Sequence, residues 1–435
     1  MLLRLAKRLS VLAVLILPFS GCNCADTYDY GWELRANDTL VTDSGADISS
    51  DTSPDIRPVD VRDVTDTFVP VDVSDTLPDI DTWRPDEVEP EVCEEAKNDR
   101  TSIVVDDKGT MWLGYHKYRG QGCRNSTLVV AHRRVAGRWV REDIQPHEGI
   151  FAVSTIDTNR PIAVYPDAAQ GTFKAAHREG FRRWRFHDFD VGAHRVDRRD
   201  GFDVTEDGEQ FFVTFAEDEA PKVRLYSYDT TAGNPQWKSR APLRVRDPQA
   251  AMERGLRADP DDSVYLVHHS RDRLRFGIAR YDKQDDRWPE KSYFSDDNSA
   301  ANVHSFVITD DFNLCMSSRL SERLLVTCGT MFNLQMKRKL FPNERIPSDF
   351  PSSMVEGRDG TLYVVFNPED NSELRVAKRH PDGHWSVRTV FNGSSYGIST
   401  AIDKTGDLVM AFYTCGRFGR GSCSLKVIQE RPDGL

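Results

Sequence analysis

The sequence lacks the patterns that would place it among metal-binding or membrane-spanning proteins. No CxxC spacing occurs among its 8 cysteines, and no D-x-D-x-D-G loop occurs among its 69 acidic residues. Zinc and calcium sites need ligands at fixed offsets, so these absences argue against both. The apolar run at residues 9–19 is too short for a spanning helix. We expect no metal and no cofactor.

Lysine is absent from residues 26–92, which hold 19 Asp and Glu against 4 Arg and so carry −15. The whole chain carries −12 and residues 1–25 carry +3, so residues 93–435 are neutral. A neutral domain has no general attraction for nucleic acid. Few aromatics and one-signed charge cannot offset the entropy of ordering, so residues 22–92 are predicted to be a disordered acidic tether rather than a calcium array.

The first 21 residues have the form of a bacterial export signal. Arg4, Lys7 and Arg8 precede the apolar run, which ends in Phe19-Ser20-Gly21-Cys22. This ending resembles a lipobox, which implies lipid on Cys22 and a membrane partner reached through that anchor. Asn23 is not the Asp that commonly retains lipoproteins at the inner membrane, so the resemblance implies the outer membrane. An ordinary secretory signal, with Cys22 and Cys24 as stray thiols, is the alternative.

Residues 93–435 repeat one phrase seven times, at a period of roughly 40–50 residues. The first copy begins SIVVDDKGTMWLGY at residue 102, which reads as a strand, an Asp-Gly turn and a second strand. Two further strands complete each unit, and a tryptophan marks the fourth. Four antiparallel strands cannot bury both faces alone, so the pattern predicts an all-β, seven-bladed β-propeller of four-stranded antiparallel blades.

Two details of the repeats predict how the ring is built. The seventh unit ends without room for a fourth strand, so we expect residues 83–96 to supply it. The fourth-strand tryptophans are expected to pack between blades rather than to stack on a ligand; they are Trp139, Trp184, Trp237, Trp288 and Trp385.

The phrases SIVVDDKGTMWLGYH and SMVEGRDGTLYVVFNPEDNSELRVAKRHPDGHWSVRTV resemble the sialidase-like (BNR/Asp-box-related) propeller repeats of bacterial secreted proteins. The resemblance covers about residues 100–430 and implies fold rather than activity. Sialidases use three arginines, a Tyr–Glu pair and an Asp. The complete Asp-box motif is absent here, and the Arg-Ile-Pro phrase at residues 345–347 stands in the wrong part of the domain. Their mechanism therefore does not transfer residue by residue.

The cysteines of the repeat domain are predicted to form disulfides, because an exported domain lies in an oxidising compartment. Cys315 and Cys328 lie on the two strands of one hairpin, and Cys415 and Cys423 flank a loop between strands. The remaining pair, Cys93 with Cys123, would pin the start of the domain to blade 1. A metal site is the less favoured alternative.

A site built from the propeller would lie at one end of the ring, where the second strands end. The candidate binding-face residues there are His116, Asp167, Glu217, His268, Arg319, Asn367 and Tyr413. Their carboxylates and imidazoles suit acid–base work, but solvated rim residues would look the same. A metal site of His268 and His269 with His116 is disfavoured, because adjacent strand residues point to opposite faces.

The sequence therefore favours a lipid-anchored, non-catalytic propeller that binds a protein or a glycan. The alternative is a sialidase-like glycan hydrolase. The expected division of the chain is a signal peptide at residues 1–21, a tether at 22–92 and a propeller at 93–435.

Overall fold

The computed structural model describes most of the chain from Trp83 onward. The described residues are 83, 85–93, 100–119, 125–134, 137–147, 149, 151–156, 160–167, 172–189, 202–207, 209–216, 222–232, 236–244, 251–259, 263–269, 275–295, 303–311, 313–330, 336–347, 352–416 and 423–430. The regular elements in these ranges are β-strands, and no helix in them is long and apolar enough to cross a membrane. The predicted signal peptide, Cys22, and the tether before Trp83 lie outside the described residues.

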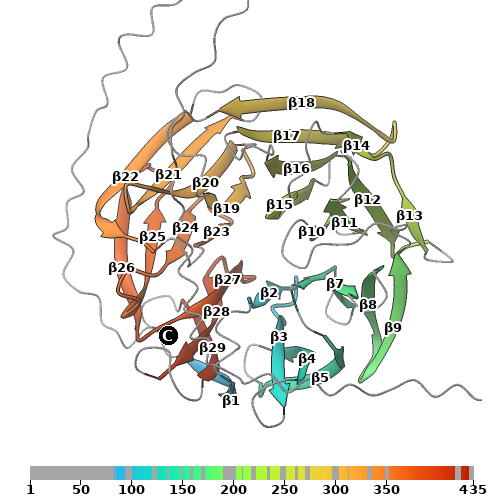
Figure 1. Ribbon diagram of the computed structural model, residues 1–435, viewed down its shortest axis with the longest axis horizontal. Helices are drawn as coiled ribbons and strands as arrows, with labels where there is room; N and C mark the ends of the chain where they lie inside the picture. The colour runs from blue at the N-terminus through green and yellow to red at the C-terminus, as the bar shows by residue number, and fades with distance from the viewer. Residues whose placement is uncertain are drawn as a thin grey trace, which may run out of the picture. The chain divides into compact units, whose positions relative to one another are not determined.

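Seven antiparallel sheets lie around a common centre as the blades of a β-propeller (Figure 1). The predicted fold class is confirmed. From the innermost strand outward, blade 1 is β2 (Ser102–Val105), β3 (Met111–Arg119), β4 (Asn125–Arg133) and β5 (Val140–Pro146). Blade 2 is β6 (Ala152–Thr155), β7 (Pro161–Asp167), β8 (Thr172–Gly180) and β9 (Arg183–Phe189). Blade 3 is β10 (Phe202–Glu206), β11 (Gln210–Ala216), β12 (Lys222–Asp229) and β13 (Trp237–Ser239), with β14 (Leu243–Arg244) also paired to β12.

The next three blades repeat this order. Blade 4 is β15 (Ala251–Asp259), β16 (Ser263–His269), β17 (Arg275–Asp282) and β18 (Arg287–Ser295). Blade 5 is β19 (Val303–Ile308), β20 (Asn313–Leu320), β21 (Arg323–Thr330) and β22 (Met336–Arg345). Blade 6 is β23 (Ser353–Glu356), β24 (Leu362–Phe366), β25 (Glu373–Arg379) and β26 (Trp385–Asn392).

Blade 7 is completed by both ends of the repeat domain. Its inner strands are β27 (Tyr396–Ile402), β28 (Leu408–Cys415) and β29 (Cys423–Gln429), and its outer strand is β1 (Asp86–Val92). β1 pairs with β29 in antiparallel register from Asp86↔Val427 to Val92↔Cys423. The prediction that residues 83–96 supply the missing strand is confirmed. The propeller therefore includes residues that a division of the chain at 92/93 would assign to the tether.

The aspartates of the repeated phrase build the turns between first and second strands. Asp106 Oδ1 accepts hydrogen bonds from the backbone N–H of Lys108 (3.0 Å) and Thr110 (2.7 Å), and Gly109 has φ +80°. Asp403 Oδ1 accepts from the N–H of Asp407 (2.9 Å) at the matching turn of blade 7. An Asp side chain that caps such a turn and a residue tolerant of positive φ are the local requirements of this hairpin.

The marker tryptophans pack between blades, as predicted. Each outer-strand ring contacts the preceding blade. Two of them donate a hydrogen bond: Trp184 Nε1 to Glu142 Oε2 (3.0 Å) and Trp288 Nε1 to Ala241 O (2.7 Å). The other two pack against a phenylalanine ring, Trp237 at 4.7 Å from Phe189 and Trp385 at 5.2 Å from Phe341. Trp139 packs against the core shared by blades 1 and 7. Trp83, which precedes β1, packs in the same way against blade 6, where the guanidinium carbon of Arg388 lies 4.7 Å from the centre of its ring.

Hydroxyl groups of the inner strands link neighbouring blades. Ser102 Oγ accepts the backbone N–H of Val153 (3.0 Å), and Ser305 Oγ accepts that of Met354 in the same way (3.0 Å). At the closure, Thr101 Oγ1 donates to Gly397 O (2.6 Å). Small hydroxyl residues recur at the start of the repeats because they satisfy backbone groups that two twisted inner strands leave unpaired.

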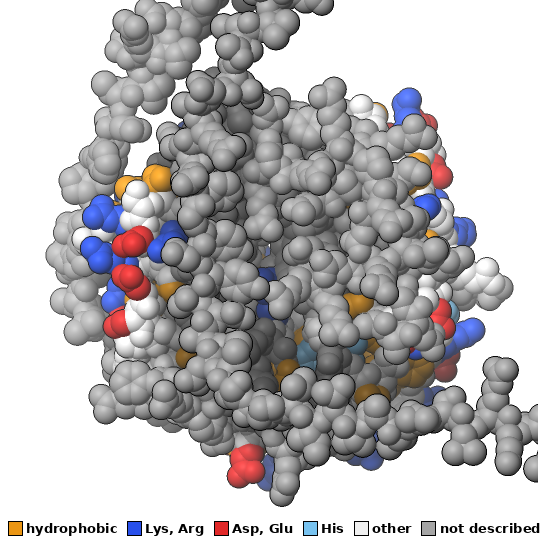
Figure 2. Space-filling model, viewed as in Figure 1, with side chains coloured by type: hydrophobic (Ala, Val, Ile, Leu, Met, Phe, Trp, Pro, Cys, Tyr) orange, Lys and Arg blue, Asp and Glu red, His pale blue; other side chains and the backbone are white. Residues whose placement is uncertain are grey.

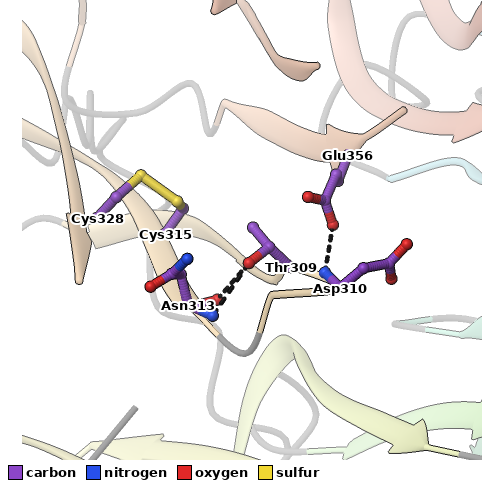
Figure 3. The surroundings of a disulfide bond; sticks show 6 residues. All are labelled: Thr309, Asp310, Asn313, Cys315, Cys328 and Glu356. Carbon is purple, nitrogen blue, oxygen red and sulfur yellow. Dashed lines mark hydrogen bonds between the residues drawn. A yellow bond between two sulfur atoms is a disulfide. The ribbon is translucent and has the colours of Figure 1, made fainter. Parts of the chain in front are cut away.

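Two predicted disulfides are confirmed, and both cross the second and third strands of a blade. Cys315 and Cys328 are directly opposite in β20 and β21, and Cys415 and Cys423 are opposite in β28 and β29. They lie at opposite ends of their blades, because Cys315 is near the start of its strand and Cys415 is at the end of its own (Figure 3 shows the first pair beside the Asn313 turn). Cys93 is disulfide-bonded, while Cys123 lies outside the described residues.

Removing the blade 5 disulfide is expected to destabilise the propeller. We expect Cys315→Ala with Cys328→Ala to lower the free energy of unfolding by about 3 kcal/mol, since the bond closes a short loop in the unfolded chain. Denaturant titration under oxidising conditions measures the effect. An unchanged midpoint would show that the hairpin register alone holds these strands.

Candidate functional site

The candidate site is the end of the propeller where second strands pass into third strands, which we call the loop face. His116, Asp167, Arg319, Asn367 and Tyr413 all lie at that end of their blades. His116, Asn367 and Tyr413 are buried, with exposed fractions of 0%, 2% and 0%. Their side chains therefore lie beneath the face rather than on it. Glu217 lies outside the described residues, and His268 belongs to β16.

The described candidates are committed to partners within the protein. Asp167 Oδ2 lies 2.6 Å from Lys174 Nζ in blade 2, and Arg319 Nε donates to Ile346 O (3.0 Å) in blade 5. Asn367 Oδ1 accepts from Ser395 Oγ (2.6 Å), which joins blades 6 and 7.

Only one pair of the described candidates is brought together. Tyr413 Oη accepts the backbone N–H of His116 (3.3 Å), which links blade 7 to blade 1. The contacts described for Asp167, Arg319 and Asn367 are with residues outside the candidate set, so these strand ends form separate anchoring contacts.

A buried histidine pair lies under the loop face between blades 1 and 2. His116 Nε2 is 3.0 Å from His147 Nδ1, and His147 Nε2 is 3.1 Å from Pro166 O. A carbonyl only accepts, so His147 Nε2 carries a proton and donates it. In its neutral form His147 Nδ1 then accepts from His116 Nε2, and this order fixes both tautomers.

Burial sets the charge state of His147. Burial, followed by the neighbouring His116, lowers the pKa of His147 to about 3. The ring is therefore neutral near pH 7 and cannot supply a proton there. The ring of Tyr165 stands edge-on to it at 5.0 Å, and burial raises the pKa of that phenol. This arrangement is suited to holding two blades in register.

The lowered pKa predicts an acid-sensitive fold. Above pH 6.5 His147 is neutral in both states and contributes nothing to the pH dependence. As pH falls from 6.5 toward 3, the unfolded chain binds a proton that the folded chain excludes, so stability decreases. Between pH 6.5 and 4 we expect a loss of about 3 kcal/mol from this residue.

The non-titrating variant His147→Gln isolates this contribution. Its unfolding free energy should start lower at pH 7.5 and then fall less steeply between pH 6.5 and 4 than that of the wild type. Chemical denaturation at several pH values provides the comparison. Parallel pH profiles for the two proteins would contradict the assignment.

A Tyr–Glu pair is present, but its environment does not suit a nucleophile. Tyr115 Oη donates to Glu89 Oε2 (3.1 Å), and Lys117 Nζ lies 3.1 Å from the same oxygen. Burial, followed by the charge of Glu89, raises the pKa of Tyr115. Both side chains are buried between β3 and β1, so the pair fixes the closing strand.

Three described arginines at the loop-face ends of blades 5 and 6 lie near a carboxylate. Arg319 lies 3.9 Å from Glu322, Arg345 lies 3.8 Å from Glu369, and Arg375 Nη1 lies 2.6 Å from Glu344. A carboxylate-binding arginine triad needs guanidinium groups that are open to the substrate. Figure 2 shows the same mixing of signs, with red and blue side chains next to one another at the rim of the propeller.

One histidine spacing escaped the sequence analysis. His380 and His384 have the H-x-x-x-H spacing, yet they lie on the two arms of a hairpin turn with rings stacked at 3.9 Å. His384 Nδ1 lies 2.5 Å from Asp382 Oδ1. Among the described residues, no group of three or more His, Cys, Asp or Glu side chains is placed to hold a metal ion.

The sequence reasoning also missed His147 and Glu89. His147 follows β5 in the connection between blades, and Glu89 lies on the closing strand. Counting the connections from fourth to first strands as part of the loop face would have found His147, because they leave the sheets at the same end as the second strands.

Comparison with known proteins identifies a fold and not a family. No protein-family model matches the sequence, and no curated protein matches it. Among solved structures the chain is similar to Kuenenia stuttgartiensis hydrazine synthase, with a TM-score of 0.51 and 13% identity over 74% of this chain and 94% of that one. The shared feature is the fold.

Two further similar structures are a lectin and a sialidase. The lectin of Aleuria aurantia, described as a six-bladed β-propeller with a novel fucose recognition mode, gives a TM-score of 0.47 at 12% identity over 67% of this chain and 96% of the lectin. The NanB sialidase of Streptococcus pneumoniae gives 0.45 at 7% identity over 79% of this chain and 70% of the sialidase. At such identities activity does not transfer with the fold.

Proposed function

We propose that this protein is a non-catalytic binding module, a propeller carried on an acidic tether and anchored by lipid at Cys22 to the bacterial outer membrane. Its ligand on the loop face would be a protein or a glycan. The tether, the anchor and the location are read from the sequence. The propeller supplies a rigid frame on which differing loops are displayed.

The observation that supports this proposal is the pairing of the described polar groups at the loop face. Asp167, Arg319 and Asn367 are each held by a partner inside their own or a neighbouring blade. Acid–base catalysis needs a group within reach of substrate and with a pKa tuned to its task. Polar groups that are hydrogen-bonded or ion-paired between or within blades stabilise the surface on which the loops are presented, and they do not provide such a catalytic group.

The alternative, a sialidase-like glycan hydrolase, is tested directly. The chain from residue 22 onward, with Cys22 and Cys24 changed to serine, is assayed against a panel of glycosides, with Glu217→Gln as the comparison. We expect no turnover by either protein. Robust turnover that the Glu217→Gln variant loses would replace the proposed function with hydrolysis. Glycan and surface-protein binding arrays then identify the ligand class.

The anchor is tested separately. Mass spectrometry of the N-terminal peptide from membranes is expected to show Cys22 as the first residue, carrying lipid. Cys22→Ala is expected to release the protein into the soluble fraction, because several acyl chains are needed for stable anchoring. A membrane-bound Cys22→Ala protein would contradict the proposed anchor.

A further inference from the structure

Among the strands that the structure describes, β9 in blade 2 pairs on one side only, so its other side is an open sheet edge. β9 is the last strand of its sheet and pairs with β8 in unbroken register from Phe173↔Phe189 to Arg178↔Trp184. Every second residue of an outermost strand directs its backbone N–H and C=O away from the sheet. Such an edge is a template for another strand unless it is protected by proline, lysine, a bulge or shortness.

The other outer strands carry such protection. Three of them contain a proline: Pro90 in β1, Pro289 in β18 and Pro342 in β22. β13 is short, with only 3 residues. Register shifts interrupt the pairing of β5 and β26 with their neighbours. β9, with the sequence RWRFHDF, has no proline and no lysine, and its pairing is without a shift from Trp184 to Phe189. The single shift lies at the turn, between Arg178 and Gly180.

The side chains along this edge are aromatic and basic. Phe181 is 61% exposed and Phe186 is 43% exposed, and they are the large hydrophobic residues exposed in the described part of the chain. Arg183 and Arg185 are exposed in the same strand; Arg185 Nη1 lies 3.6 Å from Glu179 Oε1, and Asp188 is the exposed acidic residue of β9. Arginine and aromatic residues are the types that dominate binding energy at protein interfaces, and carboxylates are the natural partners of arginine.

The turn that leads into β9 adopts a conformation that its residues disfavour. Arg182 has φ +55°, although asparagine or glycine suits that position better. Its backbone N–H donates to the buried Glu142 Oε2 (3.0 Å), and its guanidinium stacks over the Phe181 ring at 5.1 Å. An exposed Phe–Arg pair is thus presented without further ordering, which reduces the entropic cost of binding.

We propose that β9 binds an extended, acidic polypeptide segment of another protein, which adds a fifth strand to blade 2. The backbone edge supplies the hydrogen bonds, Phe181 and Phe186 supply apolar contact, and Arg183 and Arg185 select carboxylates. A second copy of β9 would bring two more arginines and one aspartate to this edge, so an acidic segment complements its charge better. The site is separate from the loop face and does not depend on the function proposed for that face.

A synthetic peptide of alternating valine and aspartate tests the proposal against the chain from residue 22 onward, with Cys22 and Cys24 changed to serine. Hydrogen exchange followed by mass spectrometry is expected to show about tenfold slower exchange in β9 with saturating peptide and no change in the outer strands of the other blades. Fluorescence anisotropy is expected to show saturable binding that weakens as salt rises from 0.05 to 0.5 M, because exposed charges are screened.

Matched variants separate strand addition from general charge attraction. Arg183→Glu with Arg185→Glu is expected to weaken binding at least about tenfold, since it reverses the complementary charge. Arg287→Glu with Arg345→Glu changes the same net charge at residues that are 65% and 62% exposed, and it is expected to leave binding unchanged. Phe186→Lys, which protects the edge without touching the turn, should also abolish binding.

Three results would overturn the proposal. One is equal binding of a peptide of the same charge in which proline replaces every valine, because that peptide cannot add a strand. Another is slow exchange in β9 before peptide is added, which would mean that a segment of this chain already covers the edge. The last is a doubled mass in light scattering without peptide, with β9 protected, which would make a second copy the occupant.

Discussion

Deletion of residues 83–92 is expected to lower the melting temperature of the propeller by about 10 °C and to promote aggregation. The deletion removes the outer strand of blade 7 and three buried apolar side chains, those of Trp83, Val88 and Val92. Each contributes roughly 1.5–3 kcal/mol by leaving water, and a few degrees of melting temperature are lost for each kcal/mol. It also exposes β29 as a new edge.

Polar contacts across the closure add to this effect. Asp86 pairs with Arg133, Val88 O accepts from Arg141, and Glu89 lies 3.1 Å from Lys117. These contacts join β1 to blade 1, so losing the strand opens the ring between blades 7 and 1. A blade interface lost on one side leaves each neighbour with an uncovered apolar face.

Deletion of residues 30–75 is the control, measured by differential scanning calorimetry on both proteins. It removes tether and leaves β1 intact, so the melting temperature should stay within about 1 °C of the full chain. Equal tolerance of the two deletions would contradict the closure as a source of stability. The point variant Val88→Asp tests the same closure without changing chain length.

Substitution of Glu142 by glutamine is expected to lower the free energy of unfolding by about 3–5 kcal/mol, since it leaves a buried arginine without its counter-charge. Glu142 is 2% exposed, and its Oε1 lies 2.8 Å from Arg178 Nη2. Its Oε2 accepts from Trp184 Nε1 and from the backbone of Arg182, both at 3.0 Å. One carboxylate thus joins blade 1 to blade 2.

Burial raises the pKa of Glu142, but His132, whose Nε2 lies 3.3 Å from Oε1, and the hydrogen-bonded Arg178 outweigh burial and lower it to about 2. The carboxylate therefore stays charged in the folded protein at pH values where the unfolded chain protonates. Its contribution is complete above pH 4.5 and is lost as pH falls toward 2. This loss begins below the pH at which His147 starts to destabilise the fold.

Urea unfolding at pH 7.5 measures the effect. The double variant Glu142→Gln with Arg178→Met is the matched comparison, and it should recover much of the loss because no unpaired charge remains. A Glu142→Gln protein within about 1 kcal/mol of the wild type would show that water, not the carboxylate, satisfies Arg178.

Much of the fold could be predicted because its signals are local. The Asp106 and Asp403 turns depend on a side chain and a backbone group a few residues apart, so the sequence of each repeat is enough to predict its hairpin. The closing strand was predictable by counting, because the seventh unit lacks a fourth strand. The pairing of Cys315 with Cys328 followed from their positions on one hairpin.

The candidate site was less predictable because its contacts are not local. Nothing near His116 in the sequence indicates that its ring reaches His147 or that its backbone reaches Tyr413 on blade 7. Burial of Asn367 and Tyr413 was equally hidden, since the end of a strand can turn inward to a neighbouring blade or outward to solvent. The H-x-x-x-H spacing of His380 and His384 likewise does not reveal that the two rings stack across a turn.

The sequence by itself determined the number of blades, the turn chemistry and the source of the last strand, because a repeated hairpin is encoded within each repeat. Only the tertiary structure decided which polar groups are available. Ring closure brings residues of different blades into contact, which buries Glu89 and Glu142 with their partners, while β9 is the outermost described strand of its sheet. Whether a side chain or a strand edge is exposed depends on how the sheets assemble, so it cannot be deduced from the residues of one strand alone.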